Sequence, residues 1–151
     1  MIIINGIDGL EEYCGKEVGV SEWHLVTQDQ INQFADATND HQWIHTDVER
    51  CREESPYKST IAHGFLTLSQ AAFFMDQIFR IENISMGINY GLNKVRFMSH
   101  VPVDSKIRMR AELMTLNRSE QTAKTTFRIT FEIEGNTKPV CVAEMLGLIR
   151  K

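Results

Sequence analysis

The segment from Gly64 to Phe79 constrains the fold of this chain more than any other. It runs Gly-Phe-Leu-Thr-Leu-Ser-Gln-Ala-Ala-Phe-Phe-Met before its first charged residue, Asp76. We predict a helix here that is apolar on nearly every side, which is typical of a helix buried inside a protein. It is too short to span a bilayer. The rest of the chain must therefore supply a layer that wraps around it.

The second half of the sequence supplies that layer. Apolar and polar residues alternate over 107–113 and over 123–134, which is the pattern of strands with one face in water. Residues 140–149 predict a nearly continuous apolar strand, and residues 90–101 predict another, ended by Pro102. Helices first and strands later indicate an α+β protein with an antiparallel sheet. A sheet curled around one buried helix is the hot dog arrangement.

The first 63 residues predict helical and irregular structure. Thr27 and Gln30 fit a capping box at the start of a helix, which should end near Thr38 because Asn39-Asp40 favours a turn. Weaker signals predict three further pieces: a short helix near Gly9–Cys14, a strand over 23–26, and one or two helical turns over 47–54 within an irregular stretch.

Length and composition indicate one globular domain over residues 1–151. The net charge of −4 argues against a nucleic-acid partner. No apolar run is long enough for a membrane span and the start lacks the basic region of a signal peptide, so we expect a cytoplasmic protein. Three scattered cysteines, Cys14, Cys51 and Cys141, make no disulfide framework and are expected to be ordinary thiols.

Positive charge gathers between residues 94 and 118, where six basic side chains stand against two acidic ones. A locally basic pair of strands suits a phosphorylated ligand. The same charges also suit the solvated outer face of a sheet, and the sequence leaves both interpretations open.

Asp40 and His45 are the first candidate catalytic group. Adding water across an activated double bond requires one group to take a proton from water and another proton to reach carbon, and a carboxylate with an imidazole supplies both transfers. Histidine titrates near neutral pH, whereas aspartate is a weak base unless its surroundings raise its pKa. We expect burial beside Trp43 and Ile44 to raise the pKa of Asp40. An Asp in an Asn-Asp turn is also a common turn former.

Gly64 is the second candidate, at the head of the buried helix. Backbone N–H groups at a helix start have no partner within the helix, and glycine lets a ligand approach them closely. Such an N–H stabilises a carbonyl oxygen that gains negative charge. Close packing of the helix explains the same glycine equally well. His63, Trp43 and Ser69 are further candidates for substrate contacts, although a helical serine commonly bonds to its own helix turn.

A metal site is the alternative for this region, with ligands drawn from His41, His45, Cys51, Asp40 and Asp47. A His-x-x-x-His pair serves zinc best on a helix, and this stretch predicts irregular structure. We therefore expect no metal.

Two stretches together resemble the MaoC-like dehydratases, a family that includes the R-specific (type-2) enoyl-CoA hydratases. They are Phe34 to Asp47, with Asn-Asp-His-Gln-Trp-Ile-His at its centre, and Ile61-Ala-His-Gly-Phe-Leu66. The stretch Tyr90 to Phe97 is most similar to the nodulation protein N branch. The similarity covers roughly residues 20–150. The usual pattern has Gly before the Asp and Asn-Pro after it, where this chain has Asn39, Gln42 and Trp43.

The resemblance implies a hot dog fold, a homodimer, and reversible hydration of an enoyl thioester carried by CoA or an acyl carrier. It places Asp40 and His45 on the family's catalytic pair, and Gly64 on the glycine whose N–H holds the thioester oxygen. No metal or redox cofactor is implied. Two other functions remain open: a hot dog thioesterase, although residues 64–75 lack the carboxylate that such enzymes place on the helix, and a silent module that binds acyl thioesters.

Overall fold

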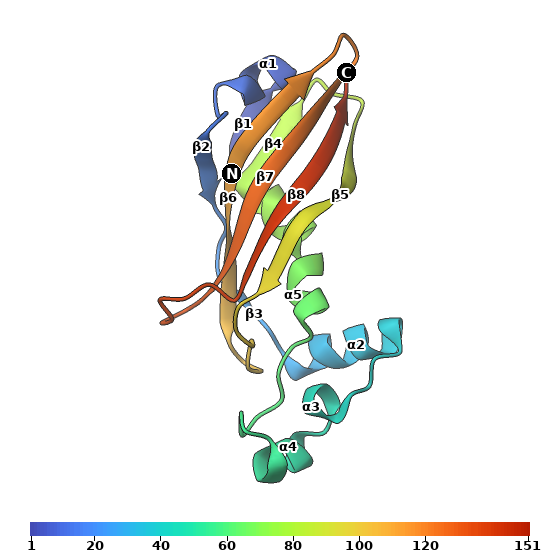
Figure 1. The fold of residues 1–151 in the computed structure, drawn as a ribbon, viewed down its shortest axis with the longest axis vertical. Coiled ribbons are helices and arrows are strands. Elements are labelled where there is room, and N and C mark those ends of the chain that lie inside the picture. The colour runs from blue at the N-terminus through green and yellow to red at the C-terminus, as the bar shows by residue number, and fades with distance from the viewer.

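A six-stranded antiparallel sheet forms one side of the protein (Figure 1). The computed structural model describes all residues, 1–151. The order β6-β7-β8-β5 joins the four long strands, and both β2 and β3 pair with β6. The bounds are β2 (Lys16–Val20), β3 (His24–Leu25), β5 (Met86–Phe97), β6 (Lys106–Arg118), β7 (Thr122–Ile133) and β8 (Cys141–Arg150). The predicted α+β class and antiparallel sheet are confirmed.

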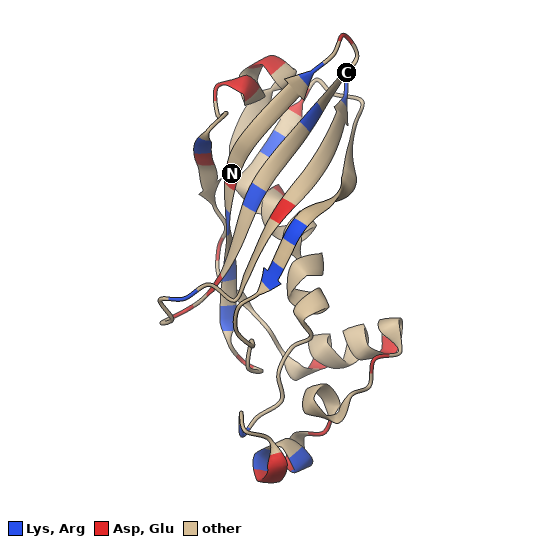
Figure 2. Ribbon diagram, viewed as in Figure 1, with Lys and Arg blue, Asp and Glu red and all other residues tan.

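The alternation in the sequence fixes the inner face of this sheet. The apolar set of β6, beginning at Ile107, and the alternate residues of β7 from Ala123 to Phe131 are buried and form most of the core. The intervening residues point outward, because successive side chains of a strand lie on opposite faces. Figure 2 shows charges of both signs along that outer face.

The basic residues between 94 and 118 are largely matched by carboxylates. Arg108 and Arg110 both bond Glu132, at 2.8 and 3.2 Å, and Lys94 lies 3.7 Å from Glu144 on β8. Arg118 pairs with acidic residues of the N-terminal helix. Of the two interpretations left open, the structure favours a solvated outer face over a bed for phosphate groups.

The apolar segment forms two helices, α5 (Gly64–Ser69) and α6 (Ala71–Ile78), rather than the single helix predicted over 64–79. At the junction the Ser69 hydroxyl donates to the Leu66 carbonyl at 2.8 Å, and Gln70 has a ψ of −3°. Hydroxyl bonds of this kind bend helices. The predicted back-bonding of Ser69 is therefore confirmed.

The helix pair lies in the concave side of the sheet, which is the hot dog fold (Figure 1). One side of it, including Phe74 at 0% exposure, packs on the sheet. The expectation of burial on nearly every side is wrong for the single chain, because Phe65 is 68% and Phe73 48% exposed. An apolar face of the helix pair is thus left without cover.

The N-terminal segment adds a small parallel sheet. β1 (Ile2–Asn5) pairs with β4 (Phe79–Glu82), and α1 (Gly6–Glu11) follows β1 directly. The predicted helix near Gly9–Cys14 therefore exists but begins earlier. The pairing of β1 with β4 was not predicted, since it joins segments from opposite ends of the helical region.

Three helices extend from one end of the sheet: α2 (Gln28–Thr38), α3 (Trp43–Thr46) and α4 (Val48–Glu54), called the α2–α4 lobe below (Figure 1). The predicted N-cap of α2 is confirmed, as the Thr27 hydroxyl accepts from the N–H of Gln30 at 3.2 Å. The reciprocal half of the capping box is absent, because the Gln30 side chain pairs with His24 instead. Asn39 ends α2 in the left-handed conformation, with φ 58°. No helix of the structure is long and apolar enough to cross a membrane.

Candidate active site

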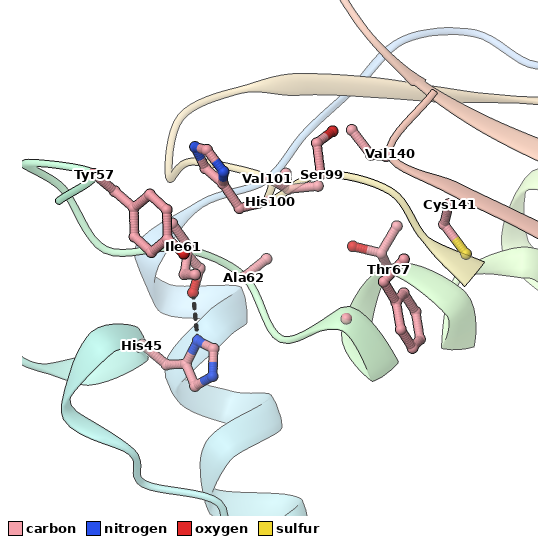
Figure 3. A pocket seen from close by; sticks show the side chains of 12 residues that line it. His45, Tyr57, Ile61, Ala62, Thr67, Ser99, His100, Val101, Val140 and Cys141 are labelled. Atoms are coloured by element: carbon pink, nitrogen blue, oxygen red, sulfur yellow. Dashed lines mark hydrogen bonds between the residues drawn. The ribbon is translucent and has the colours of Figure 1, made fainter. Parts of the chain in front are cut away.

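A cavity of about 370 Å³ lies where the α2–α4 lobe meets the start of α5 and the end of β5. His45 enters it from α3, Gly64 and Thr67 from α5, and Phe97 and Cys141 from the sheet. Figure 3 shows Tyr57 and His100 together at one end, and Thr67 and Cys141 at the other. The cavity thus brings together His45 and Gly64, while Asp40, the other member of the first candidate pair, does not line it.

His45 is held in one orientation by the chain that follows the lobe. Its side chain is buried, with the residue 7% exposed, and its Nδ1 lies 2.6 Å from the Ile61 carbonyl oxygen (Figure 3). Because a carbonyl oxygen only accepts, Nδ1 carries the hydrogen and Nε2 presents a free lone pair. Burial lowers the pKa of His45 below its ordinary 6.5; the Ile61 bond and Asp40 partly oppose this, while His63 adds to it. The neutral form, which can take a proton, therefore dominates at neutral pH.

Asp40 stands beside His45 at the end of α2. A carboxylate oxygen of Asp40 and ring nitrogens of His45 and His63 all lie within 4.8 Å of one another. One water molecule can therefore touch both the carboxylate and an imidazole nitrogen. The side chain of Asp40 is 55% exposed, so the expectation that Trp43 and Ile44 bury it is wrong.

Trp43 lies outside the cavity. Its ring is covered by the Arg50 guanidinium, 4.3 Å from the ring centre, and it is absent from the cavity lining. Ser69 borders a second, apolar groove on the uncovered side of the helix pair instead. In this chain neither residue meets the space that His45 and Gly64 share.

The Asp40, His45 and His63 group does not suit a metal ion. The two imidazole rings are stacked, with centres 3.7 Å apart and planes 25° apart. Lone pairs lie in the ring planes, so stacked rings direct them side by side rather than toward one point, as tetrahedral coordination requires.

Gly64 packs closely against Phe97. A Cβ on it would lie 3.0 Å from the nearest atom of the Phe97 ring, tighter than ordinary contact. As the first residue of α5, its N–H has no acceptor within the helix, and the residue lines the cavity. Packing and ligand approach, the two alternatives left open by the sequence, thus apply to the same position.

Cys141 and Thr67 border the cavity without having been singled out as site residues. Cys141 is fully buried, as expected of a small apolar packing residue, and burial raises its pKa to about 11. It therefore stays a thiol at neutral pH. All three cysteines are free. Cys141 lines the cavity because it begins β8 beside the end of β5. Its role could not be predicted from the sequence, because that position depends on how the strands pair.

Comparison with known proteins identifies the family of this chain. The model of the MaoC like domain matches residues 10–133. The chain belongs to the MaoC-like dehydratases. Over 147 residues it is 42% identical to 3-hydroxyacyl-thioester dehydratase Z of Mycobacterium tuberculosis, covering 97% of each chain. It is 45% identical over 138 residues to nodulation protein N of Rhizobium leguminosarum, covering 90% of this chain and 86% of the relative.

The fold of this MaoC-like protein matches solved hydratases. An R-hydratase from Pseudomonas aeruginosa superposes with a TM-score of 0.71 at 16% identity, covering 91% of this chain and 82% of that one. The MaoC-like chain is thus a lyase of the hydratase and dehydratase class, and the predicted resemblance, including the nodulation protein N branch, is confirmed.

Proposed function

We propose that this protein adds water reversibly across the 2,3 double bond of an acyl thioester carried by CoA or an acyl carrier, giving the R-3-hydroxyacyl product. The observation that carries the proposal is the free Nε2 lone pair of His45, with the Asp40 carboxylate within reach and Gly64 on the same cavity. The names of the relatives, a 3-hydroxyacyl-thioester dehydratase and an R-hydratase, support this substrate class.

The residues divide the chemistry as follows. Nε2 of His45 takes a proton from water while the water oxygen bonds to C3, and the electrons of the double bond move toward the thioester oxygen. The N–H of Gly64 stabilises that oxygen. The imidazolium then returns a proton to C2, so one water is added and His45 is neutral again. Asp40 orients the water and stabilises the imidazolium, in keeping with its raising effect on the pKa of His45.

A direct assay tests the proposal. Purified protein should consume crotonyl-CoA, seen as loss of the enoyl absorbance, and chiral analysis should identify the R product. A series of enoyl chain lengths guards against a poor choice of substrate. Release of free CoA thiol without water addition would indicate a thioesterase, and tight binding without turnover across the series would indicate a silent module. Either result overturns the proposal.

One structural observation favours water addition over thioester hydrolysis. The first carboxylate on the helix pair is Asp76, near the far end of α6 and 3.7 Å from Arg80. It does not line the cavity that contains His45 and Gly64.

Replacing Gly64 by alanine should lower kcat by about 10²- to 10³-fold, the usual loss when one oxyanion donor is disturbed. The new methyl group meets the Phe97 ring and crowds the N–H. The measurement is kcat for crotonyl-CoA, with circular dichroism to verify folding. The double variant Gly64→Ala/Phe97→Leu relieves the contact with the ring. Full recovery in that variant would show that only packing was disturbed and would contradict the role of the N–H.

The proposed enzyme is a homodimer that forms through β5. This strand is the last in the sheet, pairs only with β8, and is exposed along nearly its whole length. Unpaired strand edges invite a further strand. Ile88 and Leu92 are 40% and 43% exposed and border an apolar groove of about 600 Å³ beside the uncovered face of the helix pair. Antiparallel pairing of two β5 strands covers both the edge and the groove.

Light scattering should give a mass of about 35 kDa, twice the 17.4 kDa of one chain. The double variant Ile88→Lys/Leu92→Lys places like charges in the interface and should give a monomer. Ile3→Lys is the matched control, because Ile3 is 51% exposed on β1, outside the predicted interface. A wild-type protein of 17.4 kDa would disprove the dimer.

A further inference from the structure

His63 contacts both members of the candidate pair. Its side chain is buried, 3% exposed, and its ring stacks on His45 with centres 3.7 Å apart. Its Nε2 lies 2.9 Å from the backbone carbonyl oxygen of Asp40. Phe34 packs near the His63 ring, with centres 5.1 Å apart. The next residue is Gly64, so a single side chain links all three parts of the proposed site.

The contact with Asp40 is a hydrogen bond of known direction. A carbonyl oxygen only accepts, so Nε2 of His63 carries the hydrogen and Nδ1 is left with a lone pair. Nδ1 is buried and has no partner. The bond therefore fixes which ring nitrogen of His63 faces Asp40.

The hydrogen bond from His63 is one of few contacts that fix Asp40. The carboxylate is largely exposed and accepts only a long bond, 3.4 Å, from the N–H of Gln42. The backbone of Asp40 is held by its own N–H, which donates to the Ala35 carbonyl at 3.1 Å, and by the bond from His63 to its carbonyl. Loss of the His63 donor frees one of these two backbone anchors.

The stacked ring of His63 shields one face of His45 from water. Other titratable groups around His45 are Asp40 at the end of α2, Cys51 on α4, and Tyr57, His100 and Cys141 on the cavity wall. Burial is the largest cause of the lowered pKa of His45, and charge repulsion from His63 adds to the lowering. Removing this ring alone, with the other groups retained, should raise the pKa of His45 toward its ordinary 6.5.

We propose that His63 is a positioning residue with two separable actions: its Nε2–H holds the backbone of Asp40, and its ring, stacked on His45, fixes and desolvates that imidazole. The inference rests on the proposed hydration function for its kinetic consequences. This role needs no contact between His63 and the substrate, whereas the sequence suggested such a contact.

Two substitutions separate the two actions. His63→Gln keeps a donor near the Nε2 position but removes the aromatic ring. It should move the acidic limb of kcat/KM to higher pH, with kcat on the plateau within about threefold of wild type. His63→Phe keeps a stacked ring but removes the donor. It should lower kcat by about tenfold or more at every pH. It should move the acidic limb less than His63→Gln does, because the ring still covers His45. His24→Gln is the control, since His24 pairs with Gln30 and does not line the cavity.

Titration of the His45 ring by NMR, assigned with a His45→Asn variant, gives a readout that needs no activity. The pKa of His45 should rise most in His63→Gln, which loses both the cover of the ring and the charge repulsion from His63, and less in His63→Phe, which loses only the repulsion. It should stay at the wild-type value in His24→Gln. An unchanged pKa in His63→Gln, or equal loss of kcat in both His63 variants with unmoved limbs, overturns the proposal. Absence of turnover in the wild-type protein, with the His45 titration still shifted in His63→Gln, would overturn the hydratase function and leave the shielding of His45 by His63 standing.

Discussion

Hydration of crotonyl-CoA should fall by about 10²- to 10⁴-fold when Asp40 is replaced by asparagine, the range expected for loss of a group that assists proton transfer. Asparagine has nearly the same shape and keeps both backbone bonds of residue 40, to Ala35 and from His63. It loses the negative charge that orients water and stabilises the imidazolium of His45. Because Asp40 raises the pKa of His45, that pKa should fall further in the variant. The measurements are kcat and an NMR titration of His45.

Stability should change little in the Asp40→Asn variant, by less than about 0.5 kcal/mol, as is usual for exposed side chains without strong partners. Thermal unfolding of the two proteins tests this. Asp36→Asn is the matched control: Asp36 lies on α2, one turn before Asp40, is 77% exposed, and pairs only with His41 at 3.6 Å. It should retain wild-type kcat. Wild-type kcat in Asp40→Asn would remove Asp40 from the proposed mechanism.

Structure that depends on neighbouring residues was predicted best. The N-cap at Thr27 and the left-handed Asn39 define α2 by local hydrogen bonds and backbone angles, so the sequence contains all the information needed. Alternation in 107–113 and 123–134 similarly determined the inner face of β6 and β7. The break at Gln70 is the local feature that was missed. The Ser69 bond beside it spans only three residues, but the apolar pattern continues across the break and predicts one unbroken helix.

Contacts between distant segments were predicted worst. The stacking of His63 on His45 and its bond to Asp40 join residues that are 18 and 23 positions apart, and no periodicity marks them. Trp43 was expected to contact the substrate because it lies between Asp40 and His45 in the sequence. A helix turn separates neighbouring side chains widely, so His45 faces the cavity while Trp43 packs under Arg50. The β1–β4 pairing has the same non-local origin.

Replacing His45 by asparagine should lower kcat by about 10²- to 10⁴-fold. The amide nitrogen of asparagine can occupy the position of Nδ1 and still donate to the Ile61 carbonyl, but no group remains at Nε2 to exchange a proton. Combining it with Asp40→Asn should reduce kcat little beyond the more severe single variant, because residues that act on one water as a unit are strongly non-additive. If the two losses multiply instead, Asp40 and His45 act in separate steps, contrary to the mechanism proposed.

The pH dependence of stability gives His45→Asn a second test. A histidine whose pKa is lowered by folding binds its proton more readily in the unfolded chain, so wild-type stability is lost as the pH falls below about 6.5 toward the lowered value. The variant lacks this contribution. Its deficit in unfolding free energy relative to wild type, measured by urea denaturation, should therefore shrink between about pH 7.5 and pH 5. A constant deficit would mean that His45 binds its proton equally well in the folded and unfolded chain, contrary to the pKa that burial lowers.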